Sequence, residues 1–188
     1  MGTHYFLAVR IPRQQSAIIQ SLIKQECSRM PFKRWVHPFD YHITLAFLGE
    51  PPSGEHLLQL SDDLSEIIEG RLPSFHLDFA GIQTFGAADS PRILWLGVRP
   101  SKTLMELREE VYSCCIKNGF QLDPRPFKPH ITLARKWDGK DPYLNPDGWN
   151  PESIPSFEVP AIDLLQTNVN EEPKYKTIRS FPLTGADS

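Results

Sequence analysis

Hydrophobic positions in this chain form short continuous runs that alternate with longer helical stripes. Residues 5–11 are a short apolar run that ends at Pro12, which predicts a strand. A helical stripe follows, with apolar positions from 18 to 30, and Pro31 is expected to end it. After a short loop, residues 41–48 predict a second strand.

The same order of elements recurs in the second half of the chain. Residues 92–98 form another apolar run closed by a proline, and a helical stripe from 104 to 115 comes next. Ser101 is placed as the N-cap of this helix and Gly119 as its C-terminal cap. A loop then leads to a strand over residues 130–134.

The two halves also share the pentapeptide His-Ile-Thr-Leu-Ala, at 42–46 and 130–134. The first strand precedes it by nearly the same distance in both copies, 36 positions from Phe6 to His42 and 37 from Ile93 to His130. Two copies are too few for a solenoid, so we interpret the pattern as an internal duplication.

The remaining segments complete the predicted fold. Residues 53–70 are expected to form a helix, residues 74–84, 156–167 and 175–183 to form strands, and residues 138–155 to form a loop. The chain is therefore predicted to be a single α+β domain over residues 1–188. It is bilobal and duplicated about a pseudo-twofold, with two antiparallel-type sheets and outer helices.

The repeated segment places polar side chains on one face of each strand. Alternate residues of a strand share a face, so His42 lies beside Thr44 and His130 beside Thr132, while the residues between them point into the core. Two imidazoles across a cleft suit cleavage of a phosphoester, because one can accept a proton from the attacking oxygen and the other can protonate the leaving oxygen. The threonine hydroxyls can bind the non-bridging oxygens.

Composition narrows the alternatives. The net charge of −3 argues against a protein that binds nucleic acid through a global basic field, although Arg and Lys residues flank both segments. Three cysteines form no disulfide framework, no apolar run could span a bilayer and no signal peptide is recognisable, so a soluble cytoplasmic protein is expected. No spaced metal-ligand motif, serine nucleophile elbow or phosphate-binding glycine loop is present, so neither metal nor cofactor is expected.

Several short sequence stretches in and around the two repeated segments are similar to those of a known family. The chain is similar to the RNA 2′,3′-cyclic phosphodiesterases, also called 2′-5′ RNA ligase-like proteins, of the two-histidine phosphoesterase superfamily. The resemblance rests on the stretches 34–36 (RWV), 41–50 (YHITLAFLGE), 94–98 (LWLGV), 119–120 (GF) and 129–135 (PHITLAR). The resemblance implies a bilobal fold with a central active-site groove. It also implies an RNA-processing hydrolase that opens a 2′,3′-cyclic phosphate on RNA or a nucleotide to a 2′-phosphate, without a metal.

The resemblance also implies individual roles for the site residues. His42 would be the proton donor to the departing 3′ oxygen and His130 the proton acceptor that activates water, roles that symmetry alone does not assign. Thr44 and Thr132 would hold the phosphate, with Arg135 as a further contact. Relatives often have a basic residue in place of Ala46. The phosphate contact that this basic residue would make is expected to be missing here, or to be supplied by one of three cations: Arg34, Lys128 or Lys136.

Two alternatives stay open at the level of sequence. The same site could join 2′-5′ linkages in the reverse reaction, or the chain could be a nucleotide-binding module without turnover. RNA ends or cyclic nucleotides are the expected substrates, and we expect a monomer with no membrane association and no obligate protein partner. Of the aromatic residues that could stack on a base, Trp35, Phe47, Phe127 and Trp137, packing is the first expectation for each, and Phe127 is the first to test.

Overall fold

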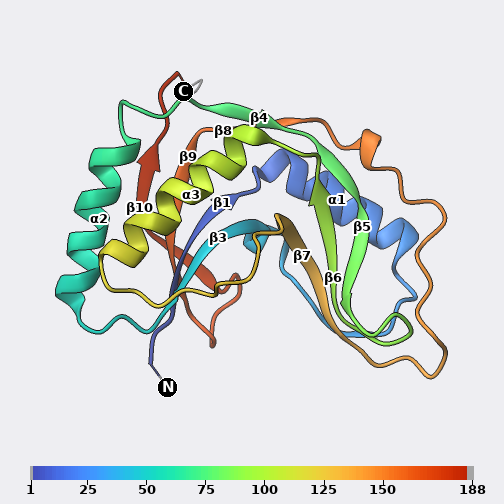
Figure 1. The fold of residues 1–188 in the computed structure, drawn as a ribbon. Helices are drawn as coiled ribbons and strands as arrows, with labels where there is room; N and C mark the ends of the chain where they lie inside the picture. The colour runs from blue at the N-terminus through green and yellow to red at the C-terminus, as the bar shows by residue number, and fades with distance from the viewer. Residues whose placement is uncertain (1, 186–188) are drawn as a thin grey trace.

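The computed structural model describes residues 2–185. Figure 1 shows three helices around a strongly curved sheet. The elements in chain order are β1 (Tyr5–Arg10), α1 (Arg13–Glu26), β2 (Phe32–Trp35), η1 (Pro38–Asp40), β3 (His42–Gly49), α2 (Gly54–Ile68), β4 (Phe75–Leu77), β5 (Phe79–Gly86), β6 (Pro91–Val98), α3 (Lys102–Lys117), β7 (His130–Trp137), η2 (Pro151–Ser153), β8 (Phe157–Val159), β9 (Ala161–Thr167) and β10 (Tyr175–Pro182).

The main sheet is antiparallel and contains both halves of the chain. Its strand order is β10-β9-β1-β3-β7-β6-β5, with β2 paired to β7. The sheet has two parts, β10-β9-β1-β3 and β7-β6-β5, which meet at β3 and β7 through one residue pair, Ile43 opposite Ile131. Each part contains strands from both halves of the chain, because β9 pairs with β1 and β2 pairs with β7. The predicted α+β fold with antiparallel sheets is confirmed, and the two predicted sheets correspond to the two parts of this main sheet.

Two of the predicted strands are each divided into a short and a long piece. Residues 74–84 form β4 and β5, and residues 156–167 form β8 and β9. In the second case the break falls at Pro160, which has no N–H to contribute to a ladder. The short pieces, β4 and β8, pair with each other in a separate two-stranded sheet. The division occurs at matching places in both halves, as a duplication requires.

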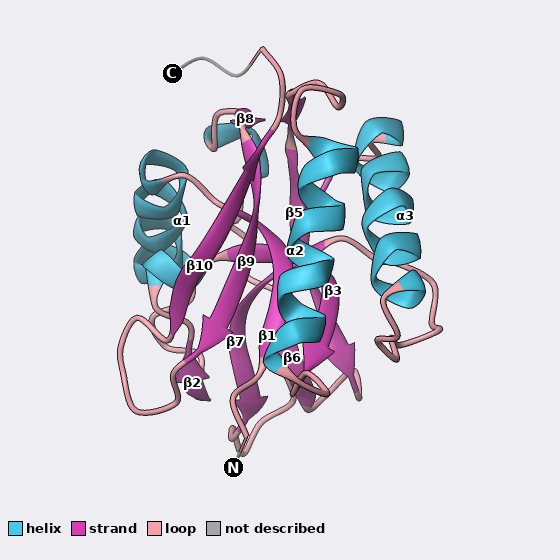
Figure 2. Ribbon diagram, turned by 90° about the vertical axis from the view of Figure 1, so that its left-hand side faces the viewer, coloured by secondary structure: helices cyan, strands magenta, loops and turns pink. Residues whose placement is uncertain are grey.

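The helices cover the side of the sheet that faces away from the two histidines. Helix α3 packs on β3, and α2 packs on α3 and β10, so the helix that follows β6 crosses to the other half (Figure 2). The predicted caps of α3 are confirmed: Ser101 Oγ accepts from Leu104 N at 3.2 Å, and Gly119 adopts φ +81°.

One prediction about the first half is wrong. Helix α1 ends at Glu26, whereas the apolar stripe extended to Met30. Residues 27–31 are irregular, and Phe32–Trp35, which were expected to be part of a short loop, form β2. This four-residue strand exists because β7, about 100 positions later, supplies its hydrogen-bond partners.

Helices, sheets and connecting loops bury one main core, which includes the three cysteines. None of the helices within residues 2–185 combines the length and the apolar character that crossing a bilayer requires.

Candidate active site

The two motif strands lie side by side at the centre of the sheet. Ile43 and Ile131 are fully buried and face the core. Their neighbours at positions ±1 therefore point to the opposite, open face. Those neighbours are His42, Thr44, His130 and Thr132, so the structure brings together the four side chains that the sequence singled out.

Backbone carbonyls fix the orientation of both imidazoles. His42 Nδ1 lies 2.6 Å from the carbonyl oxygen of Asp40, and His130 Nδ1 lies 2.7 Å from that of Lys128. A carbonyl can only accept, so in each ring Nδ1 bears the proton and the lone pair of the neutral ring is on Nε2. In His42, Nε2 accepts from the Thr44 hydroxyl at 3.1 Å. In both halves, the backbone carbonyl of the residue two positions before the histidine thus orients the ring so that Nε2 points to the open face.

Aromatic rings support each histidine. The ring of His42 lies 4.9 Å from that of Phe6 and 5.1 Å from that of Tyr175. On the other side, the ring of His130 contacts Phe85 edge-on at 5.0 Å and lies 5.7 Å from Trp95. These contacts shield the imidazoles from water and restrict their rotation.

The surroundings favour neutral imidazoles in the free protein. Burial lowers the pKa of His42 to about 4, opposed by its hydrogen bond to Asp40, while the positive charges of Arg10 and Arg135 lower it further. Burial also lowers the pKa of His130, with Arg135 and Lys128 acting in the same direction. Arg135 is therefore close enough to act on both histidines.

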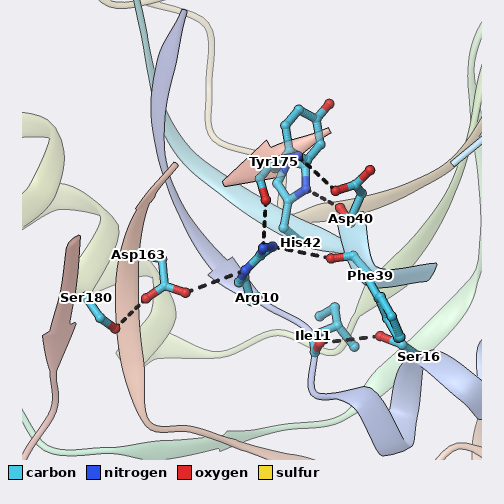
Figure 3. A network of polar contacts seen from close by, with 9 residues as sticks. All are labelled: Arg10, Ile11, Ser16, Phe39, Asp40, His42, Asp163, Tyr175 and Ser180. Atoms are coloured by element: carbon cyan, nitrogen blue, oxygen red, sulfur yellow. Dashed lines mark hydrogen bonds and ion pairs between the residues drawn. The ribbon is translucent and has the colours of Figure 1, made fainter. Parts of the chain in front are cut away.

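A network of hydrogen bonds and an ion pair fixes the segments around His42, and the sequence did not predict it (Figure 3). The buried carboxylate of Asp40 accepts from the backbone N–H of Tyr175 at 3.1 Å. It also accepts from the backbone N–H of Lys174 at 2.8 Å. Arg10 donates to the Tyr175 carbonyl at 2.9 Å and pairs with Asp163 at 3.8 Å. The network joins the start of β10 to the segment before β3, and so places the Tyr175 ring against the imidazole.

A β-bulge in each motif strand turns one further residue toward the site. In β7, Thr132 pairs with Trp95 and Ala134 with Leu94, so that Leu133 is an extra residue in the ladder. Alternation is thereby shifted by one, and Arg135 faces the same side as His130.

The first half contains an equivalent bulge in β3. There Thr44 pairs with Ala8 and Ala46 with Leu7, and the next residue, Phe47, pairs with Phe6 on the His42 side. Phe47 thus occupies the position that Arg135 has in the other half. Its side chain is 54% exposed.

The bulge also turns Ala46 into the core, so position 46 makes no contact with the open face. Of the three cations proposed as substitutes, Lys128 is the one whose positive charge contributes to lowering the pKa of a motif histidine, His130. Its Nζ is 5.0 Å from the centre of the Trp95 ring, which itself contacts His130. Arg34 pairs with Arg135 across β2 and β7, and Lys136 is exposed with φ +65°.

The four aromatic residues that were considered as possible contacts to a base comprise three packing residues and one exposed ring. Trp35 and Trp137 pack edge-on against Phe32 at 5.7 and 5.1 Å. Phe127, the aromatic residue suggested first for testing, lies under the Arg108 guanidinium at 5.1 Å on helix α3. Of these four rings, Phe47 is therefore the one that is exposed to a ligand.

Metal ligands are not gathered here: within residues 2–185, no three His, Cys, Asp or Glu side chains are grouped as a metal site would need.

Comparison with known proteins places this pair of motifs in a family. Residues 11–171 match the 2′-5′ RNA ligase superfamily. The chain belongs to this superfamily. Its similarity to curated members extends over nearly the whole chain. The RNA 2′,3′-cyclic phosphodiesterase of Bacillus subtilis is 37% identical over 187 residues, which cover 96% of this chain and 97% of that protein.

Two more superfamily members show the extent of the likeness. The RNA 2′,3′-cyclic phosphodiesterase of Geobacillus stearothermophilus is 44% identical over 98% of this chain, which spans 58% of that relative's length. Among solved structures, Escherichia coli LigT in complex with 3′-AMP superposes with a TM-score of 0.80 at 26% identity, over 98% of this chain and 99% of LigT.

Proposed function

We propose that this superfamily member is an RNA 2′,3′-cyclic phosphodiesterase that opens the cyclic phosphate to a 2′-phosphate. The observation that carries the proposal is the pair of oriented imidazoles on the open face, each with Nε2 directed away from its backbone acceptor. The curated relatives named as RNA 2′,3′-cyclic phosphodiesterases support it, since they match along most of the chain.

The reaction needs one proton acceptor and one proton donor. Nε2 of His130 takes a proton from water, and the water oxygen attacks phosphorus. The P–O3′ bond breaks, and O3′ takes a proton from Nε2 of His42, which leaves a 2′-phosphate and a free 3′-hydroxyl. Each of the two proton transfers contributes about 10²–10⁴-fold in rate.

The phosphate would lie between the two histidines. In this proposal the hydroxyls of Thr44 and Thr132 donate to its non-bridging oxygens, the former once Nε2 of His42 bears a proton and no longer accepts from it, and Arg135 adds a positive charge on the same face. In the free protein burial keeps His42 neutral, so the donor must take up its proton together with the anionic substrate. The negative charge of the phosphate raises the pKa of both imidazoles.

The proposal extends to a monomeric enzyme of the cytoplasm that acts on RNA ends or cyclic nucleotides. Three buried cysteines without disulfides fit a reducing compartment.

The test is turnover of an adenosine 2′,3′-cyclic phosphate and of a short RNA with a cyclic end, both in the presence of EDTA. We expect hydrolysis to the 2′-phosphate that survives chelation. His42→Ala and His130→Ala should each reduce kcat by about 10²–10⁴-fold, while His76→Ala, at an exposed position on β4, should leave it unchanged. Loss of turnover with EDTA and recovery with a divalent metal would overturn the metal-free mechanism. Binding without turnover would indicate a nucleotide-binding module, and joining of RNA ends to 2′-5′ linkages without hydrolysis would indicate a ligase.

A further inference from the structure

A cavity of about 480 Å³ opens directly beside His130. One wall consists of Lys128 and Pro129, the two residues before the histidine, and another includes Gly97, its partner across β6 and β7. The remaining walls come from β5 and from the start of α3. The cavity is within the size range of small-ligand sites. It lies on the same face of the sheet as the motif side chains, because two residues that line it, Trp95 and Gly97, pair with Thr132 and His130.

The charged residues that line the cavity are all positive. They are Arg99 at the end of β6, Lys102 at the start of α3, and Lys128. Arg99 pairs with Glu152 at 3.5 Å and Lys102 with Glu106 at 3.3 Å, but all four side chains are exposed. Exposed pairs of this kind contribute little energy, so a phosphate can replace the carboxylates. The first helical turn of α3 contains no acidic residue, and its partial positive charge adds to the attraction for an anion.

The inner surface of the cavity suits a flat, partly apolar group. Ala80, Val98 and Met105 line it, together with the edge of Trp95. Trp95 is only 2% exposed, and its indole N–H has no hydrogen-bond partner among the described residues. The side chain of Gln83 adds an amide that can donate and accept. A nucleobase combines an apolar face with a polar edge and fits this lining.

We infer that this cavity binds the second nucleotide of an RNA end, the one on the 5′ side of the nucleotide with the cyclic phosphate. This inference rests on the proposed function and extends it. The base of the second nucleotide lies in the cavity, and the phosphate on its 5′ side meets Lys102 and Arg99. The protein therefore favours oligoribonucleotide ends over free cyclic mononucleotides.

Two variants alter the cavity without touching the histidines. Lys102→Glu reverses a charge in the first turn of α3, where an acidic residue stabilises a helix, so the variant should fold. Its matched control is Lys117→Glu, the same change in the last turn of the same helix. Ala80→Leu fills the cavity from β5, since the Cβ of Ala80 already lies 3.4 Å from the position that a Cβ on Gly97 would take.

The experiment compares pApA with a 2′,3′-cyclic end against adenosine 2′,3′-cyclic phosphate. We expect a higher kcat/KM for the dinucleotide in the natural protein. Lys102→Glu should lower it by about 10–100-fold, the range for a lost charged hydrogen bond, and Ala80→Leu should lower it too. Both variants should leave the mononucleotide unaffected, and Lys117→Glu should change neither substrate.

Binding of the two products, which end in a 2′-phosphate, gives a second readout that does not need turnover. The logarithm of the affinity of pApA 2′-phosphate should fall more steeply with the logarithm of salt concentration than that of adenosine 2′-phosphate, by about 0.7 per additional phosphate contact. Lys102→Glu should remove part of this difference. Equal slopes, or equal losses on both substrates, would overturn the inference. If the natural protein hydrolysed neither substrate, the proposed function would fail, and the salt slopes would still decide about the cavity.

Discussion

Asp40 holds His42 from two directions. Its backbone carbonyl accepts the Nδ1 proton at 2.6 Å, and its carboxylate accepts two backbone N–H groups from the segment that places Tyr175 against the imidazole. The carboxylate is buried, and the two residues that it binds are 134 and 135 positions away in sequence. One side chain thus connects the start of β10 to the proposed proton donor.

Asp40→Asn should weaken this connection without removing the carbonyl bond. One amide oxygen can still accept one N–H, but the amide NH₂ would face the other donor, so we expect a loss of about 1–3 kcal/mol in stability. The release of Tyr175 should also lower kcat more than it changes KM, and it should move the pH profile. Denaturant unfolding and kcat measured across pH will check this.

Asp62→Asn is the control, because Asp62 is an exposed acid that pairs with Arg179 at 3.2 Å. A variant at Asp40 that lost stability but kept its kcat and pH profile would show that Asp40 only supports the fold.

The pH dependence of hydrolysis should differ between the free and the substrate-bound enzyme. Burial lowers the pKa of both histidines below 6.5, that of His42 to about 4, so both limbs of the bell for kcat/KM should lie on the acid side of 6.5. In the complex the phosphate raises both pKa values, so the bell for kcat should be displaced to higher pH. The two apparent pKa values that these limbs report describe the interacting pair of histidines and not either residue alone. A kcat/KM that keeps rising to about pH 9 would contradict a histidine acid and base.

The free energy of unfolding should decrease in mild acid because the imidazole of His42 is buried. The folded pKa of His42 is about 4, below the value of about 6.5 in an unfolded chain, so the unfolded state binds the proton first as pH falls. The stabilisation is complete above about pH 6.5 and is lost as pH falls towards 4, by an amount on the order of 1–3 kcal/mol. His42→Gln should flatten the change in free energy of unfolding between pH 7 and pH 5, and His76→Gln should not. An equal slope in both variants would assign the acid sensitivity to other groups.

Arg135 should affect both substrate binding and the titration of the histidines. Arg135→Ala is expected to reduce kcat/KM by about 10–100-fold through loss of a charge-assisted contact. It should also shift the limbs of the bell upward, because a positive charge that lowers both pKa values is removed. Arg135→Lys keeps that charge but loses the planar fork, so its limbs should stay in place while its kcat/KM falls. Limbs that shift equally in the two variants would contradict this account.

Phe47 is expected to bind the base of the terminal nucleotide. It is 54% exposed on the side of His42, whereas Phe127 is packed against Arg108. Phe47→Ala should therefore weaken nucleotide binding by ~1–3 kcal/mol, the range for stacking on one base. Phe127→Ala should instead lower stability while leaving the affinity of the remaining folded protein unchanged. Titration of adenosine 2′-phosphate into each variant separates the two outcomes, and an unchanged affinity in Phe47→Ala would exclude a stacking role.

Local sequence was sufficient for the features that depend on neighbours in the chain. The repeated segment, the alternation of its side chains and the caps at Ser101 and Gly119 all follow from residues a few positions apart. The structure accordingly places His42 beside Thr44 and His130 beside Thr132 as expected.

Features that depend on distant partners were missed. Strand β2 exists because β7 pairs with it, and Asp40 reaches a backbone more than 130 residues away. The carbonyl that orients each histidine belongs to Asp40 in one half and Lys128 in the other, so residue type gives no signal for it. The bulges that turn Phe47 and Arg135 to the site arise from ladder register, which a single strand does not specify.

The single pair of Ile43 and Ile131, where the two parts of the main sheet meet, also bears on how such an enzyme could arise. Two separate copies of one half, related by a true twofold, would present two identical imidazoles that titrate together. Acid–base catalysis needs one of the pair protonated and the other not, and identical surroundings give neither residue a preference for either role. In a single chain that contains both copies, each half can mutate alone. In this chain Tyr175 lies against His42 and Trp95 beside His130, so the two imidazoles have different surroundings, as unequal roles in proton transfer would require.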